Sequence, residues 1–248
     1  MDTPKKRIDL ILVQKKLAST RQKARALVMT GKVLVNDQPV EKPGTLVAAT
    51  DRISVRGEEI PFVSRGGLKL KAALEAFQVN PSALVCLDVG ASTGGFTDCL
   101  LQNGAKLVYA IDVGYGQIAW KLRKDKRVVV IERTNIRHMP AETLGCLVDL
   151  VTIDVSFISL RIVVPEVIKF MKSDASIIAL IKPQFEVGKE QVGKGGVVRD
   201  SRLHKSVIDE LTQFFVRIGF EVKAVMESPL TGPKGNKEFF MLLRKNEN

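Results

Sequence analysis

A short apolar segment that runs into a cluster of glycines constrains the fold of this chain more than any other stretch. Residues 84–89 are mostly apolar, which is typical of a strand buried on both faces of a parallel sheet. Three glycines follow within residues 90–95, and residues 97–103 predict a helix that Gly104 ends. Because glycine lets the backbone approach a ligand closely, this strand, turn and helix predict a nucleotide-type binding corner.

The spacing of these glycines narrows the choice of ligand. The order Gly-x-x-x-Gly-Gly differs from the Gly-x-Gly-x-x-Gly of dinucleotide folds, and it lacks the Gly-Lys-Ser/Thr of a triphosphate loop. A second strand is predicted at residues 107–111. It ends at Asp112, about 20 residues after the glycine turn, where a carboxylate suits a ribose diol. The alternative is that these glycines only form the turns of an ordinary α/β fold and bind no ligand.

This corner resembles the cofactor site of S-adenosylmethionine-dependent methyltransferases. The resemblance rests on Asp88, the three glycines and Asp112. Asn135 follows the end of a third predicted strand, where its amide either contacts an adenine or serves only in a turn. The resemblance implies S-adenosyl-L-methionine as cofactor, with contacts at Asp88, Gly90, Ala91, Ser92, Thr93, Gly94, Gly95, Phe96, Asp112, Asn135 and Asp154.

The charge of the chain indicates a polyanionic partner. The formal net charge is +11 and the sequence pI is near 9.6. Residues 1–62 hold 12 Lys and Arg against 7 Asp and Glu, whereas the other 186 residues hold 26 against 20. Positive charge is therefore denser near the N-terminus, and we look there first for a nucleic-acid contact.

The cysteines, histidines and hydropathy pattern predict a cytoplasmic protein without a metal site. Cys86, Cys99 and Cys146 lie far apart, with neither disulfide nor zinc spacing, which favours a reducing compartment. The two histidines, His138 and His204, are too few to predict a histidine metal site. The first residues hold no apolar signal core, and no apolar run reaches 18 residues, so no membrane partner is expected.

The first sixty residues predict two helices with basic faces, followed by small strands. One helix is predicted at residues 8–17, and a second begins with Ser19 as its N-cap and ends at Gly31. Short strands are predicted after it at residues 32–35 and 51–55. Residues 19–37 resemble the RNA-binding domain of ribosomal protein S4 over nearly the whole length of that module.

Basic side chains of this module would meet phosphates, and each such contact adds salt-dependent, sequence-independent affinity. A solvated helix face without a partner is the alternative. The RNA-binding candidates are Arg7, Arg21, Lys23, Arg25, Lys32 and Arg65.

The chain is predicted to have two domains joined by a short linker. The expected segments are an S4-type RNA-binding domain over residues 1–59, a linker over residues 60–64 and an FtsJ-like methyltransferase domain over residues 65–248. Ser64 is expected to cap a helix over residues 65–77. Two glycines loosen the first turn of this helix just before Lys69, where the backbone could pass close to a ligand.

Repeated β-α units predict the architecture of the larger domain. We expect a doubly wound, mostly parallel, Rossmann-like α/β sheet with an antiparallel final strand. Further strands are predicted at residues 127–131, 147–153, 176–181, 220–226 and 238–243, and helices at residues 165–171 and 202–218. Residues 186–200 are rich in glycine and lysine and predict a long loop near the active end of the sheet, and whether this loop closes over the substrate stays open. In such sheets ligands bind beyond the carboxyl ends of the strands.

Four charged residues are predicted to meet at that edge. Asp154 ends the fourth strand, Lys182 ends the fifth, and Glu238 opens the final strand. If the final strand is antiparallel, its start lies at the same edge, and Lys69 reaches this edge from the first helix of the domain. The set resembles the Lys-Asp-Lys-Glu tetrad of FtsJ-type ribose 2′-O-methyltransferases.

The whole chain resembles the TlyA (haemolysin A) family of rRNA methyltransferases. The motifs that carry this resemblance are Ser-Arg-Gly-Gly-Leu-Lys-Leu at residues 64–70, Asp-Val-Gly-Ala-Ser-Thr-Gly-Gly-Phe-Thr-Asp at 88–98, Asp-Val-Ser-Phe-Ile-Ser-Leu at 154–160 and Lys-Pro-Gln-Phe-Glu at 182–186. It implies ribosomal RNA and ribosomal subunits as partners, and cytidines of 16S and 23S rRNA as targets. The choice between one subunit and both, and the oligomeric state, stay open.

The tetrad suits proton removal from a sugar hydroxyl. A ribose 2′-hydroxyl is a very weak acid, and a lysine acts as its base only when neutral, a form that a neighbouring cation and partial burial favour. Lys182 is the candidate base, and Lys69 is the neighbouring cation. Asp154 would orient Lys182, and Glu238 would fix Lys69 or the ribose. Plain salt bridges are the alternative, and no metal is required.

Other functions fit the sequence less well. A base N-methyltransferase usually carries Asn/Asp-Pro-Pro-Tyr/Phe after the fourth strand, where this chain has Asp-Val-Ser-Phe at residues 154–157. A pseudouridine synthase often begins with an S4-type module but has no use for the glycine corner. A membrane-damaging haemolysin needs a membrane-active segment, which the sequence does not offer. A non-catalytic RNA-binding or ribosome assembly factor stays open as the alternative.

Overall fold

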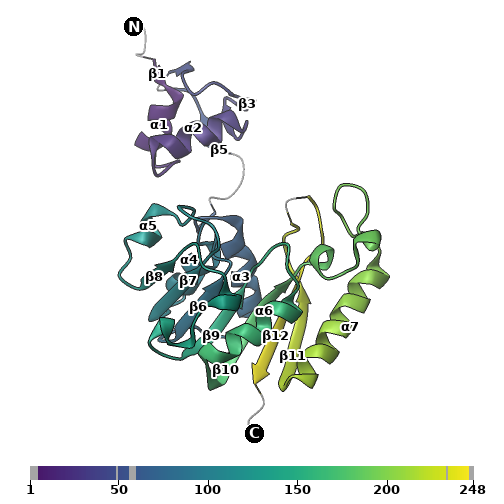
Figure 1. The fold of residues 1–248 in the computed structure, drawn as a ribbon. Coiled ribbons are helices and arrows are strands. Elements are labelled where there is room, and N and C mark those ends of the chain that lie inside the picture. Colours follow the sequence, from purple (N-terminus) through teal and green to yellow (C-terminus); the bar gives the residue numbers. More distant parts are fainter. Residues whose placement is uncertain (1–4, 49, 56–59, 233, 246–248) are drawn as a thin grey trace. The chain divides into compact units, whose positions relative to one another are not determined.

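The computed structural model divides into two compact units, residues 1–59 and residues 60–248. The structure describes residues 5–48, 50–55, 60–232 and 234–245. Residues 56–59, next to the predicted domain boundary, lie outside the described residues. Figure 1 labels the helices and strands of each unit.

The N-terminal unit packs two helices against short strands. Helix α1 covers Ile8–Gln14 and α2 covers Arg21–Met29, and their apolar faces share one core that includes Leu12 and Val28. The strands are β1 (Lys6–Arg7), which pairs with β4 (Leu46–Val47), and a sheet in the order β3 (Gln38–Pro39), β2 (Val33–Val35) and β5 (Ile53–Val55). Two helices followed by small strands are thus confirmed, but only α2 carries a basic face, because α1 holds no Lys or Arg.

The ends of these helices differ in part from the prediction. Gly31 lies just past the end of α2 with a φ of 66°, the left-handed conformation expected of a C-terminal cap. The N-cap is Thr20 rather than Ser19, because the Thr20 hydroxyl accepts a backbone N–H of the first turn at 3.2 Å. The first helix ends at Gln14 rather than at residue 17, since Lys16 adopts a φ of 58° that a helix cannot continue.

A seven-stranded sheet forms the centre of the second unit. Its strand order is β11-β12-β10-β9-β6-β7-β8, and among the described strands only β12 runs antiparallel to its neighbours. The strands are β6 (Val85–Val89), β7 (Leu107–Ile111), β8 (Val128–Ile131), β9 (Val148–Ile153), β10 (Met171–Ile181), β11 (Phe220–Glu227) and β12 (Phe239–Lys245). This topology confirms the predicted Rossmann-like sheet with an antiparallel final strand.

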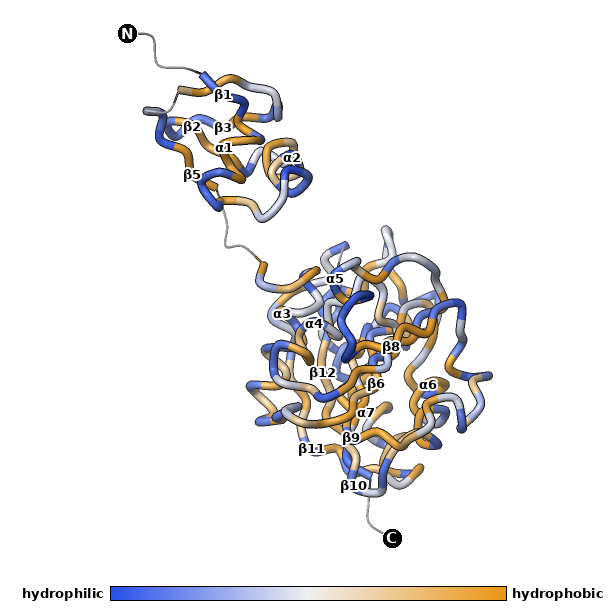
Figure 2. Tube along the Cα trace, turned by 90° about the vertical axis from the view of Figure 1, so that its left-hand side faces the viewer, coloured by the Kyte–Doolittle hydropathy of each residue, from blue (hydrophilic) through white to orange (hydrophobic). Residues whose placement is uncertain are grey.

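Helices cover both faces of this sheet (Figure 1). One core lies under α3 (Arg65–Ala76), α4 (Gly95–Gln102) and α5 (Trp120–Arg123), and the other under α6 (Leu160–Val167) and α7 (Ser201–Arg217). Neighbouring residues of β6 alternate between the two: Cys86 belongs to the first core and Leu87 to the second. Figure 2 shows the resulting hydrophobic stretches along the central strands. Short 3₁₀ helices cover Ile136–His138, Ala141–Leu144, Ile168–Phe170, Pro183–Phe185 and Lys189–Gln191.

The segment between β9 and β10 corrects the predicted boundaries. A helix lies between these strands as predicted, but the predicted bounds, residues 165–171, are wrong. Helix α6 begins at Leu160, where the Ser159 hydroxyl caps it by accepting a backbone N–H at 3.1 Å, and a 3₁₀ turn at Ile168–Phe170 follows it. Pro165 lies inside this helix rather than at its start. The following strand begins at Met171 rather than at residue 176, with a register shift against β9 near its start.

Two connecting segments are fixed to the second unit. In the predicted linker, Phe62 is buried, and the Val63 N–H donates to the Asp98 carboxylate at 2.8 Å. In the glycine-rich segment 186–200, the buried Asn236 amide accepts the Val198 N–H at 3.0 Å and also donates to a glycine carbonyl at 2.9 Å. These bonds tie that segment to the loop that precedes β12.

Candidate active site

The glycine turn after β6 brings the ends of two neighbouring strands into contact. Gly90 has a φ of 85°, and a Cβ placed there would lie 2.4 Å from the carbonyl oxygen of Asp154 at the tip of β9. A larger residue would be both strained and in collision, so only glycine fits. The turn thus leaves its backbone open toward the carboxyl edge of the sheet.

A buried carboxylate supports this turn from below. Asp88 accepts hydrogen bonds from the hydroxyls of Thr97 at 2.6 Å and Thr152 at 3.0 Å, and it lines neither of the cavities described next. Burial, which disfavours the charged form, raises the pKa of Asp88 to about 6. Asp88 therefore joins β6, β9 and α4 beneath the turn, one layer below the surface where a ligand would lie.

A cavity of about 410 Å³ opens at the tips of β6, β7 and β9. We call it the strand-tip pocket, and its lining residues are Val89, Gly90, Ser92, Ile111, Asp112, Val113, Thr134, Asn135, Ile136, Arg137, Asp154, Val155, Ser156, Phe157, Ile158 and Val163. The Asp112 carboxylate accepts the backbone N–H of Ser92 and of Gly114, each at 2.7 Å. An acid at the rim and an apolar wall suit a nucleoside, with its polar sugar and flat base.

A second cavity of about 390 Å³ adjoins it and shares Gly90, Ser92 and Asp154. We call it the ion-pair pocket, and its lining residues are Ser64, Arg65, Gly66, Lys69, Gly90, Ala91, Ser92, Thr93, Gly95, Phe96, Asp154, Lys182 and Glu238. All four predicted tetrad residues line this one cavity.

The tetrad is arranged as two lysine–carboxylate pairs. Lys69 Nζ lies 2.5 Å from Glu238 Oε2, and Lys182 Nζ lies 2.7 Å from Asp154 Oδ1. Both Lys69 and Glu238 are buried, which strengthens their attraction relative to a surface pair. Asp154 Oδ1 is buried, and among the described residues it accepts no well-directed hydrogen bond. Asp154 borders both pockets, so its carboxylate lies between the strand-tip pocket and the lysines.

The two turns that carry Asp154 and Lys182 are also tied to each other. The Lys182 ammonium donates to the Ser156 hydroxyl at 3.0 Å. Glu186 accepts from the Ser159 hydroxyl at 2.6 Å and from the Leu160 N–H at 2.8 Å, and burial raises the pKa of Glu186. These bonds fix the turn after β10 onto the start of α6, so the lysine and the carboxylate are held at a set separation.

Comparison with known proteins assigns the family. A model of the FtsJ-like methyltransferase family matches residues 62–245, and a model of the S4 domain matches residues 6–53. The chain belongs to the FtsJ-like methyltransferase family. Its two predicted modules, an S4 domain and an FtsJ-like domain, are therefore confirmed.

Three similar proteins extend over almost the whole of this FtsJ-like methyltransferase. The 16S/23S rRNA (cytidine-2′-O)-methyltransferase TlyA of Mycobacterium tuberculosis is 49% identical over 239 residues, which are 96% of this chain and 89% of that protein. The rRNA methyltransferase candidate YqxC of Bacillus subtilis is 47% identical over 244 residues, 98% of this chain and 87% of that protein. A solved structure of a hemolysin candidate from Streptococcus thermophilus has a TM-score of 0.77 and 43% identity, covering 100% of this chain and 90% of that one.

Two features are absent from the described residues of this FtsJ-like methyltransferase, 5–48, 50–55, 60–232 and 234–245. None of their helices has the length and hydropathy needed to cross a bilayer. No group of three or more His, Cys, Asp or Glu side chains among them is placed to hold a metal ion.

The predicted cofactor contacts of this FtsJ-like methyltransferase fall into three sets. Five of them, Gly90, Ser92, Asp112, Asn135 and Asp154, line the strand-tip pocket. Four more, Ala91, Thr93, Gly95 and Phe96, line the ion-pair pocket. The remaining two lie outside both linings: Asp88 is the buried support, and Gly94 packs closely on Leu122, which a Cβ would approach to 2.3 Å. The amide oxygen of Asn135 also caps the turn that follows, where it accepts the Arg137 N–H at 3.1 Å.

Sequence reasoning missed the apolar wall and the polar neighbours of the tetrad. Ser156 and Glu186 lie within the quoted motifs, but their partners are 26 or more residues away in sequence, so spacing alone gives no signal for them. Ser64 is predicted only as a helix cap, and it lines the ion-pair pocket instead, without a side-chain cap bond. Strand ends predicted the charged residues because parallel strands share one carboxyl edge.

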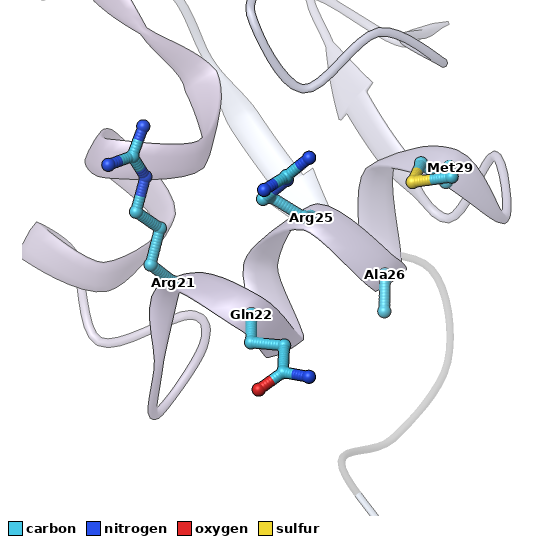
Figure 3. Close-up of a pocket in the computed structure, with 5 residues that line it drawn as sticks. All are labelled: Arg21, Gln22, Arg25, Ala26 and Met29. Carbon is cyan, nitrogen blue, oxygen red and sulfur yellow. The ribbon is translucent and has the colours of Figure 1, made fainter.

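The RNA-binding candidates occupy two regions. A groove of about 640 Å³ runs along α2 and is lined by Arg21, Gln22, Arg25, Ala26 and Met29. Figure 3 shows the two arginines on one side of the helix and the Gln22 and Ala26 side chains on another. Lys23 and Lys32 are also exposed in the N-terminal unit, whereas Arg65 is exposed in the second unit, at the lining of the ion-pair pocket.

Proposed function

We propose that this chain is an S-adenosylmethionine-dependent ribose 2′-O-methyltransferase that modifies cytidines of 16S or 23S rRNA, or both, in the cytoplasm. The observation that carries the proposal is the meeting of two lysine–carboxylate pairs in a cavity that adjoins the glycine corner. The name of the TlyA relative supports the target class, and the S4 domain supports an RNA partner. We assign RNA binding to residues 1–59, a linker to residues 60–64 and catalysis to residues 65–248.

The residues at the sheet edge fit the proposed cofactor. Gly90 provides the close backbone approach, and Asp112 offers a carboxylate to a ribose diol. The apolar wall of the strand-tip pocket suits an adenine, next to the Asn135 amide. The Asp154 carboxylate, which borders both pockets, suits a sulfonium. When bound, S-adenosylmethionine supplies a methyl group that is already activated for attack.

The chain's own residues supply proton removal and positioning. Lys182, in its neutral form, would take the proton of the ribose 2′-hydroxyl at Nζ and so make the hydroxyl oxygen the nucleophile for methyl transfer. Asp154 and the Ser156 hydroxyl hold the Lys182 side chain in place. The buried Lys69 is fixed by Glu238 and lines the same pocket, where it is placed to contact the incoming ribose. Holding the hydroxyl in line with the methyl group supplies much of the remaining rate enhancement.

Methyl transfer to separated ribosomal subunits tests this function. The full chain is incubated with radiolabelled S-adenosylmethionine and with purified small or large subunits, and the rRNA is digested to nucleosides. We expect label in 2′-O-methylcytidine. Label in a methylated base would contradict the ribose assignment, and RNA binding without label would favour a non-catalytic assembly factor.

The variant Lys182→Ala tests the base. We expect kcat to fall by about 10²- to 10⁴-fold, the usual contribution of a general base, while S-adenosylmethionine and rRNA still bind. The matched control is Lys223→Ala, which removes a lysine paired with Glu221 on β11, outside both pockets. Turnover in Lys182→Ala equal to that of Lys223→Ala would remove Lys182 from catalysis.

A further inference from the structure

Two exposed aromatic rings lie on the segment that follows β7, and the reaction described above uses neither. Trp120 is 68% exposed and Tyr115 is 67% exposed. Rings of this size are largely buried in most folded proteins, because burying them is favourable. The exposure of both rings therefore indicates a surface that binds a partner.

Each of these rings is covered on one face by a cation. Lys124 Nζ lies 4.7 Å from the centre of the Trp120 ring, and Arg133 Cζ lies 4.1 Å from the centre of the Tyr115 ring. Three other cations of this segment have carboxylate partners, in the ion pairs Lys121–Asp98, Arg123–Glu132 and Arg127–Asp125. Within the described part of the chain, Lys124 and Arg133 form no ion pair, so uncompensated positive charge gathers at the two rings.

This segment is fastened to the candidate active site. The Ala119 N–H donates to the carbonyl of Thr93, a residue of the ion-pair pocket, at 3.1 Å. The Arg133 N–H donates to the Gly114 carbonyl at 3.0 Å, which holds the two halves of the segment together. Val113, two residues before Tyr115, lines the strand-tip pocket. The rings therefore belong to the rim of the site rather than to a distant surface.

We propose that Trp120 and Tyr115 form a stacking platform for single-stranded RNA next to the nucleotide that is methylated. Every base offers a flat face to an aromatic ring, and the cation beside each ring meets a phosphate, which is the usual design of single-strand binding surfaces. A purely apolar partner would leave Lys124 and Arg133 without a counter-charge. This inference rests on the proposed function, because both take RNA as the substrate.

Fluorescence offers a local test, because Trp120 is the only tryptophan of the chain. The full chain is titrated with a single-stranded oligocytidine RNA, with inorganic polyphosphate of equal charge, and with polyglutamate. Stacking on a base is expected to quench Trp120 to a plateau with the RNA alone. Equal quenching by polyphosphate would show that charge suffices, and equal quenching by polyglutamate would point to an acidic protein partner. Either result, or no quenching by RNA, overturns the platform.

Variants separate stacking from charge. Trp120→Ala should weaken RNA binding about 5- to 100-fold and raise the KM for RNA, with the affinity for S-adenosylmethionine unchanged. Trp120→Phe should restore most of the loss, and Lys124→Ala should lower the salt slope of binding by about 0.7. Ile162→Ala, at an exposed apolar residue of α6 outside both pockets, is the matched control and should behave as the unmodified chain. Unchanged RNA binding in Trp120→Ala would refute the platform.

The same preparation separates the two proposals. If methyl transfer to subunits proceeds but RNA does not quench Trp120, the platform is wrong and the proposed function stands. If RNA quenches Trp120 to a plateau but no methyl group is transferred, the rings stack RNA bases, but the proposed function is wrong and no methylated nucleotide lies beside them.

Discussion

Asp9 is completely buried in the N-terminal unit, and two arginines hold its carboxylate ionised. Arg7 contacts it through two nitrogens, at 2.9 and 3.0 Å, and Arg21 approaches it to 3.2 Å. The hydrogen bonds from Arg7 are the largest cause that lowers the pKa of Asp9 to about 2. Two of the RNA-binding candidates are thus oriented by one buried acid.

This ion cluster makes the N-terminal unit sensitive to acid. A pKa that is lower in the folded than in the unfolded state stabilises the fold above about pH 4 and loses that effect as the pH falls through about 2. We expect hydrogen-exchange protection of α1 and α2 to decline over this range. In Asp9→Asn protection should be lower at pH 7 and nearly independent of pH, and a decline equal to that of the unmodified chain would contradict the assignment.

Ser156 provides a second prediction for a single residue. The Ser156 hydroxyl accepts a hydrogen bond from the Lys182 ammonium at 3.0 Å, so we expect Ser156 to position the proposed base. Loss of one such hydrogen bond in Ser156→Ala should lower kcat about 2- to 10-fold and leave the KM for RNA unchanged. Steady-state kinetics check this split, and Ser156→Thr, which keeps a hydroxyl, should recover activity. A change in KM alone would assign Ser156 to substrate binding instead.

Among the larger elements, the junction of β6, β9 and α4 depends on the protonation of Asp88. Its raised pKa, about 6, means that the neutral acid stabilises the fold fully below about pH 4, and this effect is lost as the pH rises through 6. Asp88→Asn removes this titration. We expect the free energy of unfolding of the Asp88→Asn variant, minus that of the unmodified chain, to rise by about 2–3 kcal/mol between pH 4 and pH 8.

Urea unfolding at several pH values, followed by circular dichroism, measures this difference. The control is Asp149→Asn, at a carboxylate on the same sheet whose pKa is lowered rather than raised. Its free energy of unfolding relative to the unmodified chain should change with pH in the opposite direction. A constant difference across the pH range would show that Asp88 is ionised in the fold throughout.

The elements that sequence predicts best are those set by local chemistry. Buried parallel strands such as β6 are mostly apolar and are followed by a charged or glycine residue, so the sequence predicts both where they lie and where they end. Asp154 and Lys182 follow from this, since strand tips share one edge. The sequence does not predict the start of α6 in the same way, because Ser159 and the distant Glu186 cap this helix together. Contacts between segments far apart in sequence leave no periodic signal.

For the whole molecule, charge is the property that joins the two units to one proposed substrate. Arg25 lies on α2 with its side chain exposed, and it forms no ion pair within the described residues. We expect Arg25→Ala to lower the slope of log affinity for rRNA against log salt concentration by about 1, and the double variant Arg21→Ala, Arg25→Ala by about 2.

Filter binding of the full chain to rRNA at several salt concentrations measures these slopes. Lys223→Ala on β11 carries the same loss of one charge and should leave the slope unchanged. An unchanged slope in the double variant would remove the α2 groove from the RNA interface.

The last strand of the chain is not at the edge of its sheet: β12 lies between β10 and β11. Without β12, the strands β10 and β11 would have no common neighbour near this edge of the sheet, and Lys69 would lack its counter-ion. Insertion of β12 fills that gap and completes the ion-pair pocket in one event. Closure of the sheet and assembly of the pocket therefore depend on the same strand.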